Sequence, residues 1–225
     1  MSDPARVAAV AAARSRIEPD MTIGLGSGRA VFALVDLLGS TWSSARRLRA
    51  VAASARTEAR ARAAGIELVT LDGDLTLDLA VDGADEIDPR LALLKGGGGA
   101  LLREKLVLAA ARQVVIVAEA VKLVDRLGDT KALPVEVVRF AWPTTRRRLL
   151  TLVPSATLRR TPDGLPFVTD EGHHLLDCAM PPGDLPTLAS ALKATLGVVE
   201  HGLFPDHADE VFLGHPDGRV QVLHR

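Results

Sequence analysis

The segment Lys95–Lys105, KGGGGALLREK, carries the most specific chemical pattern in this 225-residue chain. Its four consecutive glycines, Gly96–Gly99, which we call the glycine nest, precede an expected helix and offer backbone N–H groups to an oxyanion. Lys95 adds a positive charge beside them. Glu104 follows about a turn and a half into the helix, where the helix dipole favours a carboxylate. An ionised carboxylate near a positive charge and a set of N–H donors suits the removal of a proton from the carbon next to a carbonyl. The alternative, a flexible linker before a solvated charged helix face, fits poorly between an apolar run and a strong helix.

Four carboxylates follow an apolar, strand-like run in the segment Asp82–Asp88, DGADEID. Ligands of α/β proteins bind at the carboxyl ends of strands, so this position favours a functional site. Clustered like charges are costly unless a cation or a hydrogen-bonding ligand compensates for them. The spacing lacks the calcium-loop pattern, although such oxygens could still hold a divalent metal. An acidic, solvated turn is the more common arrangement for such a segment taken alone.

The segment Gly24–Arg29, GLGSGR, lies between an expected strand and an expected helix. Glycines permit a close backbone approach, and a helix N-terminus attracts anions. A dinucleotide-binding loop would have glycine at its sixth position, which is Arg29 here, and no well-placed acidic residue ends the next strand. The segment therefore disfavours NAD and favours a phosphate group. A tight turn without a ligand explains this segment alone equally well.

Strands and helices alternate around these three segments in the first half of the chain. We expect helices over about 4–17, 30–38, 56–64 and 99–112, and strands over 21–25, 48–52, 66–71, 77–81 and 114–118. Asp3-Pro4 is a typical helix start, and Gly65 a typical residue just past a helix end. The alternation implies parallel pairing through right-handed crossovers and predicts a doubly wound α/β unit.

The pattern changes after about Val124, where turn sequences indicate hairpins. We expect strands over 135–140, 157–160, 167–169, 174–178 and 197–200, and helices over 144–153 and 185–196. These elements predict a small α+β domain, ferredoxin-like in architecture, at residues 126–199. Two final strands, 210–214 and 219–223, are expected to pair with the first sheet. Residues 1–125 and 200–225 would then form one domain, with the small domain inserted.

The composition predicts a cytoplasmic protein with a packed core. Hydrophobic residues make up 48% and the formal net charge is −1, so nothing global favours nucleic acid or a membrane as a partner. The chain shows neither an apolar run of membrane-spanning length nor a signal peptide. The single cysteine, Cys178, is expected to be a buried structural thiol, not a nucleophile. The histidines are scattered apart from the adjacent pair His173 and His174, so we expect no metal and no cofactor.

Taken together, the three segments resemble those of the ribose 5-phosphate isomerase A family. That family carries a Gly-x-Gly-Thr-Gly-Ser-Thr loop, an Asp-Gly-Ala-Asp-Glu segment and a Lys-Gly-Gly-Gly-(Gly/Ala)-Ala-Leu-x-Arg-Glu-Lys segment. The last two stand nearly intact here at Asp82–Glu86 and Lys95–Lys105. Further matches are TDEGH at 169–173, GVVEHGLF at 197–204 and PDG at 216–218. The resemblance therefore covers essentially the whole chain, in order.

The resemblance implies an aldose–ketose isomerase that interconverts D-ribose 5-phosphate and D-ribulose 5-phosphate through a cis-enediolate, in the non-oxidative pentose phosphate pathway. It implies that Glu104 is the base, and that Asp82, Asp85 and Lys95 assist ring opening and hold the sugar oxygens. The residues implied to bind the substrate are Gly26, Ser27, Gly28, Arg29, Ala30, Gly83, Ala84, Gly96, Gly97, Gly98 and Lys122. It further implies a Rossmann-like domain with an inserted small α+β domain, no metal, and a homodimer or homotetramer.

Some positions depart from the family pattern. Ser27-Gly28-Arg29-Ala30 stands where the family has Thr-Gly-Ser-Thr, so two hydroxyls are lost and a cation is gained at the expected phosphate end. Val121 replaces a serine before Lys122, and histidines stand at 173 and 201 where asparagine is frequent. Two rival functions share the general architecture. A sugar-phosphate-sensing regulatory domain should lack the base, and a coenzyme A transferase should be longer.

Overall fold

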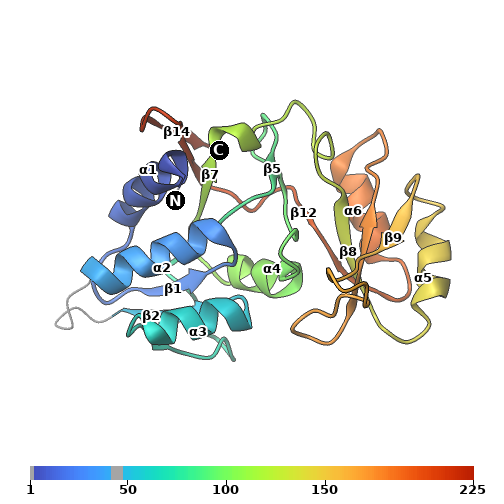
Figure 1. Cartoon of the computed structure of the whole chain (residues 1–225), viewed down its shortest axis with the longest axis horizontal. Coiled ribbons are helices and arrows are strands. Elements are labelled where there is room, and N and C mark those ends of the chain that lie inside the picture. The colour runs from blue at the N-terminus through green and yellow to red at the C-terminus, as the bar shows by residue number, and fades with distance from the viewer. Residues whose placement is uncertain (1–2, 42–47) are drawn as a thin grey trace. The chain divides into compact units, whose positions relative to one another are not determined.

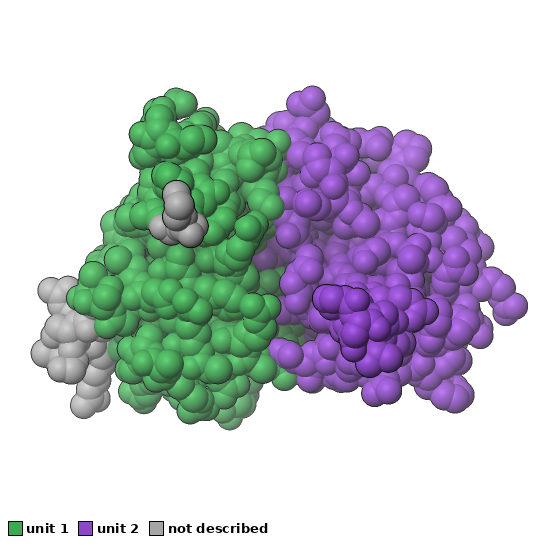
Figure 2. All heavy atoms as spheres, in the orientation of Figure 1, with its two compact units in different colours: residues 1–84, 103–123, 207–225 green, residues 85–102, 124–206 purple. Residues whose placement is uncertain are grey.

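The computed structural model describes residues 3–41 and 48–225, which form two compact units (Figure 1). Unit 1 comprises residues 1–84, 103–123 and 207–225 of the chain, and unit 2 comprises residues 85–102 and 124–206. Figure 2 colours them green and purple. Each unit has its own sheet and its own hydrophobic core.

A seven-stranded sheet forms the centre of unit 1. Its strands are β1 (Thr22–Leu25), β2 (Arg49–Ala52), β3 (Glu67–Leu68), β4 (Leu79–Asp82), β7 (Val114–Glu119), β13 (Glu210–Gly214) and β14 (Val220–His224). Across the sheet they run β14-β13-β7-β4-β1-β2-β3, all parallel except the antiparallel pair β13 and β14. Without β14, this is the strand order of a Rossmann-type sheet. Its order reverses between β1 and β4, and ligands bind at such a point, outside the carboxyl ends of the strands.

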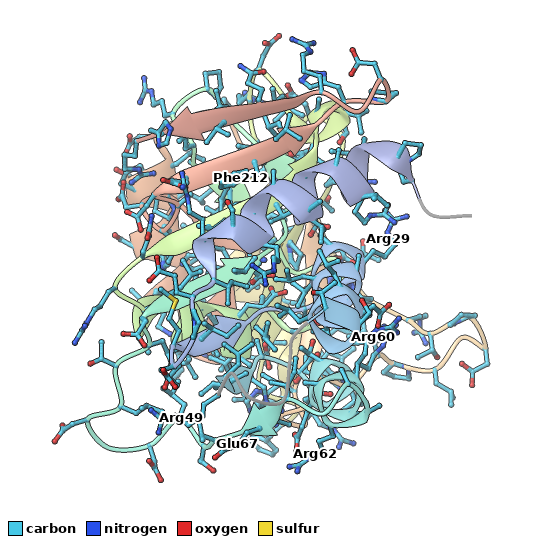
Figure 3. All side chains as sticks on the ribbon, turned by 90° about the vertical axis from the view of Figure 1, so that its left-hand side faces the viewer. Arg29, Arg49, Arg60, Arg62, Glu67 and Phe212 are labelled. Atoms are coloured by element: carbon cyan, nitrogen blue, oxygen red, sulfur yellow. The ribbon has the colours of Figure 1, made fainter. Side chains whose placement is uncertain are left out.

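Helices cover both faces of this sheet. They are α1 (Pro4–Ala13), α2 (Arg29–Thr41), α3 (Ala55–Ala63) and α4 (Leu101–Ala109), with short 3₁₀ turns at Arg14–Arg16 and Ala120–Lys122. Successive strand residues point to opposite faces. Ile23 and Leu25 accordingly join a core with α1, α2 and α3, which also includes Phe212 of β13 (Figure 3). Gly24 faces the other way, where a Cβ would lie only 2.5 Å from Cγ1 of Val107 on α4.

Unit 2 contains a four-stranded antiparallel sheet and two helices. Its elements are, in chain order, β8 (Leu133–Val137), α5 (Trp142–Leu149), β9 (Ala156–Leu158), β10 (His174–Cys178), α6 (Leu185–Lys193) and β11 (Val198–His201). The strands lie in the order β11-β8-β10-β9, which is the ferredoxin-like arrangement. Leu133, Val135 and Val137 pack with the helices, so Pro134 and Glu136 face the opposite side of the sheet.

A three-stranded antiparallel sheet completes unit 2. Its strands are β5 (Glu86–Ile87), β6 (Leu93–Leu94) and β12 (Leu203–Phe204), in the order β12-β6-β5. Each has two residues, too few to show a period-2 pattern, and none was expected from the sequence. This sheet ties residues 85–102 to unit 2, although the sequence placed them with the Rossmann-like part. The division into domains at 126 and 199 therefore stays a proposal.

The fold class expected from the sequence is confirmed, and so is the return of the tail, because β13 pairs with β7. Several expected elements have different bounds; the strand expected at 66–71, for example, spans only Glu67–Leu68. The helix expected from 99 begins at Leu101, since Gly99 has a φ of +85°. The strand expected at 167–169 is only an isolated bridge between Val168 and His174. Among the described residues, no helix combines the length and the apolar character needed to cross a bilayer.

Candidate active site

The carboxylate of Asp82 lies against the glycine loop that follows β1. Asp82 ends β4 and is buried, and its Oδ1 accepts hydrogen bonds from the backbone N–H of Ser27, at 3.1 Å, and of Gly83, at 2.7 Å. The loop itself is held by Gly26, whose N–H donates to the carbonyl of Val81 at 2.9 Å. Residues from two of the three segments singled out by the sequence thus meet at the point where the strand order reverses.

A buried hydroxyl network supports the same loop. Ser27 Oγ and Ser54 Oγ share a hydrogen bond of 3.0 Å, and Ser54 Oγ and Thr57 Oγ1 share one of 2.9 Å. Thr57 Oγ1 donates onward to the carbonyl of Gly26 at 2.8 Å. Ser54 also caps α3 by accepting from the N–H of Thr57. Neither Ser54 nor Thr57 was among the site residues expected from the sequence, although the segment 52–55 is poorer in hydroxyls than is usual in the family. A serine at the N-cap position of α3 was the available signal.

The expected phosphate-binding residues lie at the carboxyl edge of the unit 1 sheet. Arg29 is the exposed first residue of α2, Ala30 follows it half-buried, and Gly28 has a φ of +96° with open space around it. Lys122 lies just beyond β7, at the same edge of the sheet, and is half-buried. Arg6 of α1 was not among the expected phosphate-binding residues, and its guanidinium is paired with a carboxylate: it donates to Glu119 Oε1 from Nε, at 2.8 Å, and from Nη2, at 2.5 Å.

Glu104 is a buried carboxylate in the first turn of α4. It is 5% exposed, and only residues 99 and 100 separate α4 from the exposed glycines 97 and 98 along the chain. The helix begins later than expected, so Glu104 lies nearer the N-terminal end, where the helix dipole favours negative charge. Carboxylates are seldom buried to this extent, so the burial of Glu104 at the N-terminal end of α4 makes it a candidate for chemistry.

In unit 2, Asp85 contacts the glycine nest directly. Its Oδ2 accepts from the N–H of Gly97 at 2.7 Å, and its own N–H donates to the carbonyl of Leu94 at 2.8 Å. The nest forms a tight turn in which Gly99 N–H donates to the Gly96 carbonyl at 3.0 Å, with φ angles of +103° at Gly96 and +85° at Gly99. These conformations favour glycine, and they leave the peptides of 97 and 98 exposed.

Lys95 precedes the nest and is almost fully buried. It is 3% exposed, its N–H donates to the carbonyl of Gly202 at 2.9 Å, and its Nζ lies 5.6 Å from the centre of the Phe204 ring. An ammonium group over an aromatic face gains a cation–π interaction. Gly202 is required here, because a Cβ would lie 2.2 Å from the Lys95 carbonyl oxygen.

The remaining two carboxylates of the acidic segment are structural. Glu86 is fully buried, and it accepts from the N–H groups of Gly128 and Thr130, each at 2.6 Å. Asp88 Oδ1 accepts from the N–H groups of Arg90 and Ala92 within its own turn. The acidic cluster therefore divides into two residues at candidate substrate-binding loops, Asp82 and Asp85, and two that hold the backbone.

Neither a metal site nor a reactive thiol emerges from the described residues. Within 3–41 and 48–225, no three His, Cys, Asp or Glu side chains are grouped so as to hold a metal ion. Cys178 is fully buried, and burial raises the pKa of its thiol to about 12, so it stays protonated at neutral pH. This confirms the expectation of a structural cysteine.

Comparison with known proteins decides the family. The family model for ribose 5-phosphate isomerase A (phosphoriboisomerase A) matches residues 49–218. The chain belongs to the ribose 5-phosphate isomerase A family. A ribose-5-phosphate isomerase A of Synechococcus is 47% identical over 220 residues, which cover 96% of each protein. Ribose 5-phosphate isomerases A interconvert ribose 5-phosphate and ribulose 5-phosphate in the pentose phosphate pathway.

Solved structures of ribose 5-phosphate isomerases share the whole fold. The enzyme of Plasmodium falciparum has a TM-score of 0.94 at 33% identity and covers 100% of this chain and 99% of its own. A D-ribose-5-phosphate isomerase in complex with phospho-erythronic acid has a TM-score of 0.93 at 33% identity, with 100% of both chains covered. The resemblance inferred from the sequence and the isomerase class are thus confirmed, and the two rival functions are set aside. The roles of individual residues stay predictions.

Proposed function

We propose that this chain interconverts D-ribose 5-phosphate and D-ribulose 5-phosphate with Glu104 as the base. The observation that carries the proposal is the burial of this carboxylate, 5% exposed, in the first turn of the helix that directly follows the glycine nest. In the aldose-to-ketose direction, Glu104 takes the proton from C2 of the open-chain sugar. Electrons of the C–H bond form the C1–C2 double bond of a cis-enediolate. The same carboxyl group then returns its proton to C1, while the proton of the O2 hydroxyl passes to O1, so that O2 becomes the ketone oxygen and O1 a hydroxyl.

Three further side chains are proposed to manage the oxygens of the sugar. Ring opening moves a proton from the C1 hydroxyl to the ring oxygen, and Asp82 and Asp85 are placed beside backbone loops from which they can relay it. Negative charge then develops on the oxygens of the enediolate. Lys95 and the N–H groups of the glycine nest are proposed to stabilise that charge, because preorganised donors act where charge develops. No step in this scheme uses a metal or a cofactor.

The phosphate end is proposed to bind at the carboxyl edge of the unit 1 sheet. The N-terminus of α2 and the backbone of the preceding loop favour an anion there. The residues proposed to contact the substrate through this loop and its neighbours are Gly26, Ser27, Gly28, Arg29, Ala30, Gly83, Ala84 and Lys122. Gly96, Gly97 and Gly98 are proposed to contact the sugar oxygens.

The test is turnover of ribose 5-phosphate by purified Glu104→Gln, with EDTA present. General-base catalysis typically contributes ~10²–10⁴-fold, so kcat should fall by about that factor in a folded variant. Glu58→Gln is the matched control, since Glu58 is a surface residue paired with Arg62 in α3. Exchange of the C2 proton of ribose 5-phosphate in D₂O, followed by NMR, should be lost in parallel. Near-native exchange and turnover in Glu104→Gln would remove Glu104 from the mechanism.

We also propose that the chain acts in the cytoplasm as a homodimer or homotetramer, with neither nucleic acid nor membrane as a partner. Large apolar side chains on unit 2 support self-association, since Phe140 is 89% and Leu196 is 74% exposed. Light scattering coupled to size-exclusion chromatography measures the mass directly. A mass of one chain, 23.8 kDa, at micromolar concentration would contradict the proposed assembly.

A further inference from the structure

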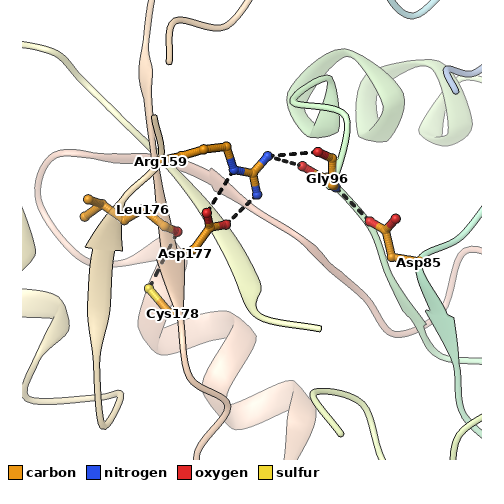
Figure 4. A network of polar contacts seen from close by, with 7 residues as sticks. Asp85, Gly96, Arg159, Leu176, Asp177 and Cys178 are labelled. Atoms are coloured by element: carbon orange, nitrogen blue, oxygen red, sulfur yellow. Dashed lines mark hydrogen bonds and ion pairs between the residues drawn. The ribbon is translucent and has the colours of Figure 1, made fainter. Parts of the chain in front are cut away.

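A guanidinium outside the three chemical segments contacts the backbone of the glycine nest. Arg159 follows β9, and its Nη1 donates to the carbonyl oxygens of Gly96, at 2.8 Å, and of Gly97, at 3.1 Å (Figure 4). The N–H of Gly97 in turn donates to Oδ2 of Asp85 at 2.7 Å. We propose that Arg159 is a positioning residue that fixes the glycine nest and, through it, Asp85. This inference rests on the roles proposed above for the nest and for Asp85.

The hydrogen bonds from Arg159 set the direction of the exposed peptides of the nest. In a trans peptide the C=O and the N–H point in opposite directions. Carbonyls of Gly96 and Gly97 that are held toward Arg159 therefore turn the N–H groups of Gly97 and Gly98 to the opposite side. Glycine peptides rotate easily when nothing holds them. Because donors to a developing negative charge are effective only when they are preorganised, this orientation bears directly on catalysis.

Arg159 can orient these peptides because its side chain and its backbone are both fixed by neighbouring residues. Its Nε donates to Asp177 Oδ2 at 3.0 Å, its Nη2 also pairs with Asp177, and its side chain is 15% exposed. Its guanidinium lies 6.0 Å from the ring centre of Phe167, and the same ring lies against Gly99, where a Cβ would be 2.6 Å away. The Arg159 backbone is fixed by hydrogen bonds to Leu175 and from Phe167. The whole assembly belongs to unit 2.

The geometry requires an arginine and not merely a positive charge. One edge of the planar guanidinium binds the Asp177 carboxylate, and the remaining nitrogen reaches both carbonyls. A lysine ammonium is a compact charge without this fixed fork, so it can pair with Asp177 or with the carbonyls but cannot reproduce both. Arg159→Lys therefore keeps the charge and removes the geometry.

The experiment compares Arg159→Lys with Arg160→Ala, measuring kcat and KM for ribose 5-phosphate and the fraction folded by circular dichroism. Arg160 is an exposed neighbour that donates to the Gly164 carbonyl in the adjacent turn, so its variant should behave as the wild type. Small displacements of catalytic groups cost on the order of 10²-fold, so kcat of Arg159→Lys should fall by ~10- to 100-fold. KM should change by less than about threefold, because the loss concerns the transition state.

A double variant tests the route of the effect. If Arg159 acts through the peptide that binds Asp85, the losses in Arg159→Lys and Asp85→Asn should not multiply when the two changes are combined. Multiplying losses would overturn the proposal. So would a kcat of Arg159→Lys within about twofold of the wild type, or a loss that disappears when the rate is expressed per folded molecule.

A second variant keeps the proposal testable if Arg159→Lys does not fold. Asp177→Asn weakens the anchor of Arg159 without touching the nest, and it should lower kcat in the same direction. An unchanged kcat in folded Asp177→Asn would overturn the proposal. Glu104→Gln in the same assay distinguishes the positioning role of Arg159 from the proposed role of Glu104 as the base. If Glu104→Gln is inactive while the Arg159 and Asp177 variants are normal, only the positioning role fails, whereas an active Glu104→Gln removes the proposed base itself.

Discussion

The Asp82 carboxylate fills the space in which a side chain at position 26 would lie. A Cβ built on Gly26 would be 2.0 Å from Cγ of Asp82 and 2.1 Å from its Oδ1. The same Oδ1 accepts the N–H groups of Ser27 and Gly83. The missing side chain at position 26 is therefore what allows a buried carboxylate to lie against the glycine loop at the reversal of the strand order.

Gly26→Ala should accordingly damage both stability and activity. Extra methyl groups in packed sites typically cost ~1–3 kcal/mol, and here the carboxylate must also give up its hydrogen bonds. Gly83→Ala is the control for stability, because a Cβ there meets only ordinary contacts at 3.7 Å. Urea unfolding measures the difference. Equal midpoints for Gly26→Ala and Gly83→Ala would mean that Asp82 moves aside without cost.

Asp82→Asn and Lys95→Ala should lower kcat more than they raise KM. Both residues are proposed to respond to charge that changes along the reaction, and such interactions are stronger in the transition state than in the bound substrate. Asp72→Asn and Lys131→Ala, at exposed positions, are matched controls for loss of a carboxylate and of an ammonium group. Steady-state kinetics with ribose 5-phosphate decides the matter. A change confined to KM in both variants would reassign them to binding of the ground state.

The sequence could indicate these candidate residues because strand ends are visible in it. An apolar run followed by glycines or carboxylates marks the place where β1 and β4 end, and parallel strands bring such ends to one edge of a sheet. The Rossmann-like and ferredoxin-like arrangements followed from the alternation of elements and from the hairpin turns. These features depend on local patterns a few residues long.

Contacts between distant segments could not be predicted in this way. Arg159 is separated from Gly96 by 63 residues, and no spacing in the sequence connects them. In the sequence the four carboxylates of the acidic segment look alike. In the structure, however, Glu86 accepts hydrogen bonds from the backbone N–H groups of residues 128 and 130, some forty residues away along the chain. Only the structure distinguishes this residue from Asp85. The two-residue strands that join residues 85–102 to unit 2 could not be predicted from the sequence either, since they are too short to show a periodic pattern of apolar residues.

The buried carboxyl group of Glu136 should make the free energy of unfolding depend on pH. Its side chain is 1% exposed, and burial raises its pKa above the ordinary 4.5, despite hydrogen bonds with Thr169 Oγ1 at 2.8 Å and His173 Nδ1 at 3.0 Å. The folded state then binds the proton more tightly than the unfolded state. The stabilisation that Glu136 contributes is fully present below the pKa that its carboxyl group has in the unfolded state. It is lost as the pH rises through the higher pKa of the folded state.

Glu136→Gln removes this titration while keeping an oxygen that accepts from Thr169. The free energy of unfolding of the wild type should therefore fall relative to that of the variant as the pH rises above the ordinary pKa of about 4.5 and through the raised pKa of the folded state. Urea unfolding at several pH values measures the difference between the two proteins. The same comparison in a His173→Asn background separates the contribution of the imidazole. A wild-type advantage that is constant, or that grows with pH, would contradict the assigned direction.

Arg29 predicts a specific effect on the phosphate end of the substrate. It is the exposed first residue of α2, and the positive end of the helix dipole disfavours a cation there unless an anion is present. The family pattern has a hydroxyl at this position, whereas a guanidinium can make a bidentate, charge-assisted contact with a phosphate. Arg29→Ala should raise KM for ribose 5-phosphate by a factor that corresponds to a loss of about 1.5–3 kcal/mol of binding free energy, the range for hydrogen bonds to charged groups.

Arg49 provides the matched control for Arg29, because the two arginines lie at opposite edges of the same sheet (Figure 3). Arg29 follows the carboxyl end of β1, whereas Arg49 is exposed at the start of β2, beside Thr22 at the start of β1. Arg49→Ala should leave KM unchanged, and any turnover of unphosphorylated ribose should be nearly unaffected by Arg29→Ala. Inorganic phosphate should inhibit the wild type more strongly than Arg29→Ala, since it competes for the same contact. Equal losses on ribose and ribose 5-phosphate would show that Arg29 supports the loop and does not bind the phosphate.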